Sequence, residues 1–125
     1  MLLNKNIVFE IIDTNFIDDV TDCCEESVLR MDEDELGDYF EEYADKACLE
    51  TIYDINVEDY DEEEKDGIQT VEGLLEIAAL INGYADWGDE AEYIGDAEVI
   101  LGFAFSFQID TQTNEAGFFD IAWEY

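Results

Sequence analysis

The chain has 125 residues, of which 36 are Asp or Glu and four are Lys or Arg, for a net charge of −32. Hydrophobic residues make up 48% of it, which excludes the intrinsically disordered class and predicts one folded domain spanning residues 1–125. The charge excludes direct binding to nucleic acid or to an anionic membrane, since both interactions need Lys and Arg on the protein.

The residue types also argue against catalysis and metal binding. His is absent, so the commonest general base is missing and no Ser-His or Cys-His pair can be assembled. The three cysteines, Cys23, Cys24 and Cys48, lack Cys-x-x-Cys spacing, which indicates reduced thiols and argues against a disulfide framework or a zinc site. No stretch has the ligand spacing of an EF-hand calcium loop. We therefore expect no enzyme activity, no metal and no cofactor.

The start of the chain predicts a strand and then a helix. Residues 7–12 are apolar apart from one Glu and predict a short buried strand. From residue 16 the apolar residues recur at helical spacing through Val20, Cys24 and Val28, which predicts a helix over residues 16–29. No apolar run approaches the ~20 residues needed to cross a bilayer, and residues 1–6 do not resemble a signal peptide. We expect a cytoplasmic protein.

A second helix is predicted over residues 32–52. Asp32 and Glu35 have the spacing of a capping box, and an apolar stripe at i, i+4 and i+7 spacing begins at Leu36. The opposite side of this helix would carry a row of carboxylates without Lys among them: Asp34, Asp38, Glu41, Glu42 and Asp45. Like charges at this spacing destabilise a helix, so the row indicates a functional surface.

The middle of the chain is predicted to hold an acidic loop, a buried helix and a second loop. Residues 54–66 have the composition of a loop, with carboxylates at Glu58, Asp59, Asp61, Glu62, Glu63 and Glu64. The apolar run that follows predicts a central helix over residues 66–81. Residues 84–96 form a connecting loop with a smaller acidic patch that includes Asp86, Asp89 and Glu90. Trp87 and Tyr93 in this loop are either exposed anchors or core residues.

The C-terminal part gives the clearest strand pattern. Large apolar residues alternate with smaller or polar ones over residues 99–109 and again over residues 118–125, which predicts a β-hairpin with one apolar face. Together these elements predict an α+β fold in which about three helices pack on a small antiparallel sheet that includes the C-terminal β-hairpin.

The density of negative charge predicts the kind of partner. A compact fold of this length would be on the order of 36 Å across, so the net charge of −32 gives about 0.9 charges per Å, against about 0.6 for duplex DNA. Of the 36 carboxylates, 17 fall within residues 32–66. We therefore expect a basic nucleic-acid-binding protein as partner, bound through the acidic residues named above.

In size, extreme negative charge, scarcity of Lys and Arg, and acidic blocks such as MDEDELGDYFEEYAD and VEDYDEEEKD, the chain resembles the small acidic DNA-mimic proteins of phages and mobile elements. The resemblance is to a class and not to a motif, so it transfers no site residues. It implies an anti-restriction or anti-CRISPR inhibitor that occupies the basic cleft of a nuclease or another defence protein.

Two alternatives share the same composition. An immunity or antitoxin-type protein would neutralise a cationic nuclease toxin through a similar acidic face. An acidic structural domain, of the kind that halophilic proteins carry, would have no decoy role and would need high salt to fold.

Overall fold

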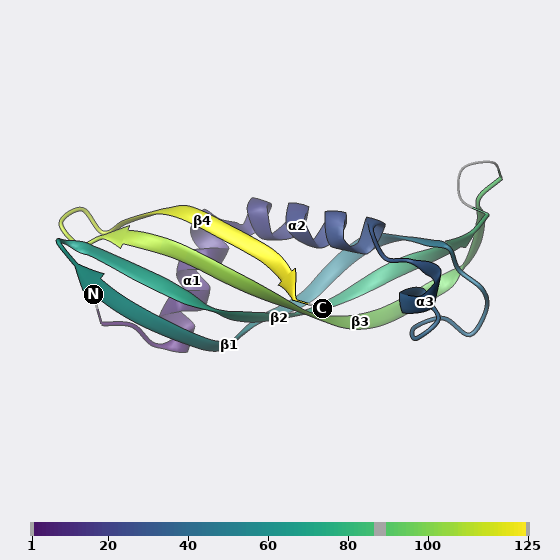
Figure 1. Cartoon of the computed structure of the whole chain (residues 1–125), viewed down its shortest axis with the longest axis horizontal. Helices are drawn as coiled ribbons and strands as arrows, with labels where there is room; N and C mark the ends of the chain where they lie inside the picture. Colours follow the sequence, from purple (N-terminus) through teal and green to yellow (C-terminus); the bar gives the residue numbers. More distant parts are fainter. Residues whose placement is uncertain (1, 87–89, 125) are drawn as a thin grey trace.

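The sheet dominates the architecture. In the computed structural model, which describes residues 2–86 and 90–124, the elements follow in the order α1 (Lys5–Asn15), α2 (Ile17–Leu29), α3 (Glu33–Leu36), β1 (Lys46–Lys65), β2 (Ile68–Ala85), β3 (Glu92–Asp110) and β4 (Glu115–Glu124). The four strands of this described part form one antiparallel sheet in the order β1-β2-β3-β4, each paired with its neighbour in the chain (Figure 1).

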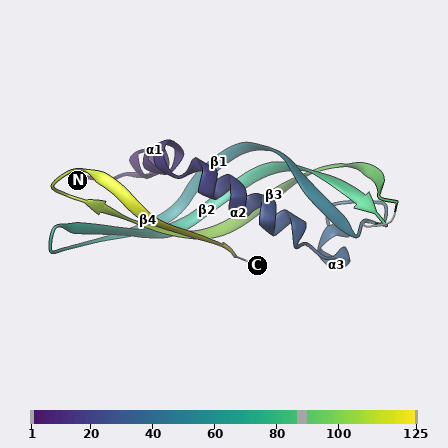
Figure 2. The same ribbon diagram turned by 90° about the horizontal axis from the view of Figure 1, so that it is seen from above.

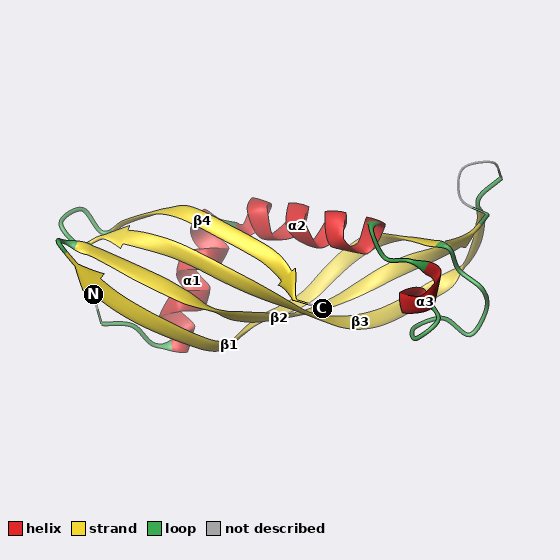
Figure 3. Ribbon diagram, viewed as in Figure 1, coloured by secondary structure: helices red, strands yellow, loops and turns green. Residues whose placement is uncertain are grey.

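The prediction of about three helices on a small sheet is wrong. Strands β1, β2 and β3 contain 20, 18 and 19 residues, whereas α1, α2 and α3 contain 11, 13 and 4. Figure 3 shows how far the strands extend beyond the helices that pack on them. Most of the residues predicted to be helical after residue 36 belong to strands.

Residues 7–12, predicted to be a strand, form most of α1. The side chain of Asn4 caps this helix by accepting a hydrogen bond from the backbone N–H of Ile7 at 2.9 Å. Val8 and Ile12 lie four residues apart on its buried face. A run this short fits either period, and the cap together with packing against β1 decides for the helix.

The helix predicted over residues 16–29 is confirmed as α2. Its buried residues include Val20, Cys24 and Val28, the spacing from which it was predicted. Phe16, between α1 and α2, stacks on Phe119 of β4 with ring centroids 4.5 Å apart. This contact holds the helix pair against the C-terminal strand.

The predicted helix over residues 32–52 is wrong beyond its first turn. The capping box forms: the backbone N–H of Glu35 donates to Asp32 Oδ1 at 2.9 Å, and the Glu35 side chain accepts from the Asp32 N–H at 3.4 Å. The helix nevertheless ends at Leu36. Residues 37–45 are turns and loop, and residues 46–52 enter β1, where they pair with β2.

The acidic loop predicted over residues 54–66 and the helix predicted over residues 66–81 are also wrong. They are the two strands of a long hairpin, joined at Asp66 (φ 54°) and Gly67 (φ 80°). Positive φ at both central residues is the signature of a type I′ turn, which suits the twist of an antiparallel pair. Strand β2 is therefore central and is hydrogen-bonded on both sides.

The core lies on one face of this sheet. Along β2 and β3 the odd-numbered residues from Val71 to Gly83 and from Val99 to Ile109 are buried, apart from the half-buried Gly73, and the even-numbered ones are half-buried or exposed. Phe16 contacts Phe107 on the buried side, with ring centroids 5.7 Å apart, so the helices cover that face. We call the other side, formed by the even-numbered residues of β2 and β3 and their partners in register, the open face.

The C-terminal hairpin joins β3 to the shorter β4. Strand β4 pairs only with residues 102–110 of β3. The turn between the two strands is closed by a hydrogen bond from the Asn114 N–H to Asp110 O at 2.7 Å. The first half of β3, residues 92–101, extends past the end of β4 toward α3 (Figure 1).

The molecule is elongated and twisted. Seen from two directions, β1, β2 and β3 run along the length of the molecule, β4 covers one half of it, and α2 crosses the strands obliquely (Figures 1 and 2). At about 3.3 Å per residue, the 20 residues of β1 extend over roughly 65 Å. The diameter of about 36 Å expected for a compact fold of this length is therefore wrong. The negative charge is distributed along an elongated molecule, which we call the rod.

Candidate partner-binding surface

The residues predicted to bind the partner form two groups at opposite ends of the sheet. Near α3 lie Asp34, Asp38, Glu41, Glu42 and Asp45, together with Asp86 and Glu90 from the β2–β3 connection. The backbone N–H of Asp45 donates to Tyr84 O at 3.0 Å, which joins the α3 loop to the end of β2. Asp89 and Trp87 lie outside the described residues.

The other group lies in β1 near the β1–β2 turn. Because strand side chains alternate, it is divided between the two faces of the sheet. Asp59, Asp61 and Glu63 oppose open-face residues of β2, while Glu62 and Glu64 oppose Val71 and Gln69 on the helix side. Glu58 occupies the register shift between Val57 and Asp59.

The predicted acidic row on one helix face therefore does not exist. Asp34 is in α3, Asp38 is in a turn, and Glu41, Glu42 and Asp45 are in the loop before β1. All the predicted residues that the structure describes are exposed except Asp45, which is half-buried. They are accessible, but they are not one surface.

The open face brings together carboxylates that the sequence analysis did not select. Asp61, Glu72, Ser106 and Asp120 form one row across the four strands, and Asn56, Glu76, Gly102 and Glu124 form another. We call Glu72, Glu76, Asp120 and Glu124 the acidic frame. Glu72 and Glu76 come from β2 and Asp120 and Glu124 from β4, with β3 between them.

Apolar residues lie inside the acidic frame. Between its two rows lie Leu74, Ala104 and Ala122. Glu72 and Asp120 border a groove of about 330 Å³ whose floor includes Ala104 and Ser106. The strand geometry puts the frame carboxylates about 10 Å apart across β3 and about 13 Å apart along the strands. Long cationic side chains could reach the sheet between them.

At the α3 end of the open face, polar groups orient the carboxylates. With its amide placed so that its hydrogen bonds are satisfied, Asn82 donates to Glu50 Oε2 at 3.0 Å and to Asp96. The Tyr93 hydroxyl also donates to Asp96, and this hydrogen bond raises the pKa of Tyr93 to about 12. On the α3 loop the Tyr43 hydroxyl donates to Glu33 Oε2 at 2.8 Å, which likewise raises the pKa of Tyr43 to about 12.

Several large apolar side chains are exposed among these acids. On the open face Leu74 is 40% exposed and Ile100 is 65% exposed, and in β4 Phe118 is 85% exposed. Tyr93, predicted as either an anchor or a core residue, is 54% exposed. The surface therefore offers apolar contact as well as charge.

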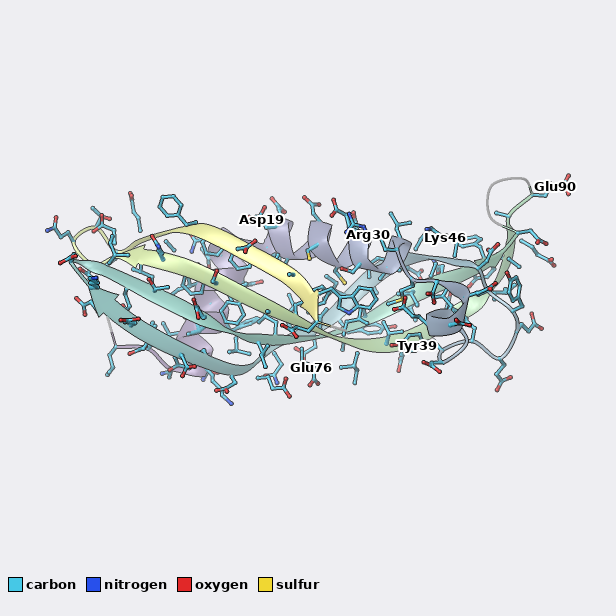
Figure 4. All side chains as sticks on the ribbon, viewed as in Figure 1. Asp19, Arg30, Tyr39, Lys46, Glu76 and Glu90 are labelled. Atoms are coloured by element: carbon cyan, nitrogen blue, oxygen red, sulfur yellow. The ribbon has the colours of Figure 1, made fainter. Side chains whose placement is uncertain are left out.

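Negative charge is not confined to the open face. Asp18, Asp19, Asp22, Glu25 and Glu26 are exposed along α2 on the opposite side of the sheet. In Figure 4 Asp19 and Glu76 project from opposite sides of the molecule, and Glu90 projects from one end. The whole length of the rod is acidic.

Two of the cysteine thiols lie in surroundings that favour their protonated form. Burial raises the pKa of the Cys24 thiol to about 11 and also raises that of Cys23, which disfavours the reactive thiolate. Within residues 2–86 and 90–124, no three Cys, Asp or Glu side chains gather as a metal site would require.

No helix in the same residues has the length and apolar character needed to span a membrane.

Comparison with protein-family models, with curated proteins and with solved structures found no match to this chain.

The sequence analysis misses Glu72 and Glu76 of the open face because it predicts a helix over residues 66–81. The turn dipeptide Asp66-Gly67 was the signal that could have placed Glu72 and Glu76 on a strand. Asp120 and Glu124 alternate with apolar residues in the predicted hairpin, but their relation to β2 depends on the sheet order.

Proposed function

We propose that this protein is a DNA-mimic inhibitor that occupies the basic nucleic-acid-binding cleft of a nuclease or another defence protein. The observation that carries the proposal is the amount of charge on an elongated scaffold. The net charge of −32 over roughly 65 Å gives about 0.5 charges per Å, close to the value of about 0.6 for duplex DNA. At ~3.4 Å per base pair, the rod is as long as about 19 base pairs.

The arrangement of the strands supports the same proposal. Carboxylates on paired strands are held at regular intervals, so their positions do not depend on flexible loops. A cleft built to neutralise phosphates carries Lys and Arg at comparable spacing, and its binding to this surface would release condensed counterions into solution, as its binding to DNA does. Association should be fast and should weaken steeply with salt.

The proposal assigns no catalytic step to the protein. Inhibition would follow from occupancy of the cleft, so the partner would be a basic protein and not a nucleic acid. A partner of this kind works in the cytoplasm, where we also place this protein.

The test is competition with DNA. The immobilised protein is loaded with cell lysate at low salt and eluted with duplex DNA of about 20 base pairs, and the eluted proteins are identified and purified. A purified target should lose its DNA binding when the inhibitor is added and regain it in excess duplex. If the target binds the inhibitor and DNA at the same time, or if excess duplex does not relieve inhibition, the proposal is wrong.

A folding measurement separates the proposal from a halophilic structural role. Circular dichroism should show the protein folded at ~0.15 M salt, where the screening length is ~8 Å. A chain that folds only in molar salt would support the structural alternative instead.

A further inference from the structure

The β4 strand holds a bulky residue in an unfavourable backbone conformation. Phe118 has φ 55°, in the left-handed region that glycine tolerates and large side chains avoid. It lies at an irregularity in the β3–β4 ladder, where pairing passes from Gln108 and Gly117 to Ser106 and Asp120. The left-handed conformation falls on Phe118 and not on the adjacent Gly117, although glycine would adopt it without strain. The needs of the backbone therefore do not explain why Phe occupies this position.

Packing does not explain Phe118 either. Its side chain is 85% exposed, the most exposed aromatic residue in the described part of the chain. The neighbouring Phe119 instead turns to the helix side and stacks on Phe16. Burial therefore does not offset the backbone strain at Phe118, and an observed outlier of this kind is a reason to look for a function.

Phe118 borders a groove that combines apolar and acidic groups. The groove has a volume of about 240 Å³ and is lined by Ile68, Gln108, Asp110, Glu115 and Ala116 as well as Phe118. Asp110 and Glu115 face each other across the ladder, an arrangement that is unfavourable for like charges. In the same row Ile68 stands between Asp110 and a basic residue of β1, Lys65.

The walls of the groove are held in place. The backbone N–H and the hydroxyl of Thr111 both donate to Gly67 O, at 3.0 and 2.9 Å, so the β3–β4 turn is fastened to the β1–β2 turn. The backbone N–H of Gln112 donates to Asp110 Oδ1 at 2.9 Å and fixes that carboxylate. The site is therefore preformed.

We propose that this groove receives an arginine side chain of the basic partner, with the guanidinium stacked on the Phe118 ring and hydrogen-bonded to Asp110 and Glu115. This inference rests on the proposed function. Arginine fits better than lysine because its planar guanidinium stacks on aromatic faces, pairs with carboxylates and is weakly hydrated. In the cleft of a DNA-binding protein, Phe118 would take the place of a base and the two carboxylates that of phosphates.

The charge of the groove decides against a second copy of this chain as the occupant. Each molecule carries a net charge of −32, so two acidic faces repel each other unless cations intervene. A basic, arginine-bearing surface is attracted by the same field.

The test compares oligo-arginine and oligo-lysine peptides of equal length, titrated into the full chain at ~0.05 M and ~0.15 M salt. The unmodified protein should bind oligo-arginine more tightly. Phe118→Asn should weaken oligo-arginine binding by about two- to fivefold, the size of an exposed cation–π contact, and weaken oligo-lysine binding less. Because Asn accepts left-handed backbone readily, the melting temperature of Phe118→Asn should equal or exceed that of the unmodified protein. Ile100→Asn, at another exposed apolar position on the open face, is the control and should leave the arginine preference intact.

The possible failures are distinguishable. Equal binding of both peptides, or an oligo-arginine affinity that Phe118→Asn leaves unchanged, would overturn the arginine site and leave the proposed function standing. If neither peptide binds at low salt, both the arginine site and the proposed function are overturned. Self-association that depends on Phe118 would show that a second copy occupies the groove and would also overturn the proposal.

Discussion

The ring of Phe40 lies directly over Gly83 of β2: a Cβ added to Gly83 would be 2.6 Å from Phe40 Cζ. Gly83 is opposite Ala47 in β1 and Gly95 in β3, so the ring covers the end of the central strand. This contact holds the acidic loop of residues 37–45 on the sheet after α3 has ended.

Gly83→Val should destabilise the fold by about 1 to 3 kcal/mol, because the new side chain has no room beneath Phe40. The measurement is urea denaturation followed by circular dichroism. Gly102→Val is the matched control, since nothing lies within 4 Å of a Cβ at that position on the open face. Phe40→Ala removes the ring, so Gly83→Val should destabilise the fold less in the Phe40→Ala background than in the unmodified protein. If the two losses in the free energy of unfolding simply add, the contact is contradicted.

Adjacent leucines in β2 test the assignment of this segment to a strand. Leu75 is fully buried and Leu74 is 40% exposed, because neighbouring strand residues point to opposite faces. Leu75→Ala should lower the free energy of unfolding by about 2 to 5 kcal/mol, and Leu74→Ala by less than about 1 kcal/mol. Similar losses for the two variants would show that the register is wrong.

Tyr43 and Tyr93 should ionise late. Hydrogen bonds to Glu33 and Asp96 raise both pKa values from the ordinary 10.0 to about 12, so an absorbance titration should show two phenols that ionise near pH 12. A raised pKa favours the protonated folded state, so the associated stability is fully present below pH 10 and is lost as pH rises through about 12. Glu33→Gln removes the charged acceptor and should return Tyr43 toward 10 without affecting Tyr93.

Charge reversal should distinguish the open face from the helix face. Replacing the acidic frame (Glu72, Glu76, Asp120 and Glu124) with Lys should weaken binding to a DNA-competing target by about fourfold to nearly a thousandfold, at ~0.2 to 1 kcal/mol for each of four exposed pairs lost. The matched control replaces Asp18, Asp19, Asp22 and Glu25 on α2 and changes the net charge equally. The acidic-frame variant should melt no lower than the unmodified protein, since like-charge repulsion is reduced. In the control, Asp18 and Asp19 lie in the first turn of α2, where Lys opposes the helix dipole and offsets part of that gain. Equal losses of affinity would mean that total charge matters and the open face does not.

The largest error of the sequence analysis arose in β1 and β2. In β1 the register shifts between Leu49 and Thr51, between Ile52 and Asp54, and between Val57 and Asp59. Each shift changes which residues face the helices, so the alternation expected of a strand is not visible in the sequence. In β2 apolar residues also stand on the open face, at Leu74, Ala78 and Leu80, so the alternation is hidden and periodicity alone does not separate this strand from a buried helix.

The sequence by itself determined the net charge of −32, the helix now seen as α2 and the alternating faces of the C-terminal hairpin, because these follow from composition and from contacts close in the chain. Only the tertiary structure decided that residues 46–85 form two long strands, since their pairing joins residues far apart in sequence. It also decided which carboxylates share a face: Glu72 and Asp120 are 48 residues apart and meet across Ser106 only because β3 pairs with both β2 and β4.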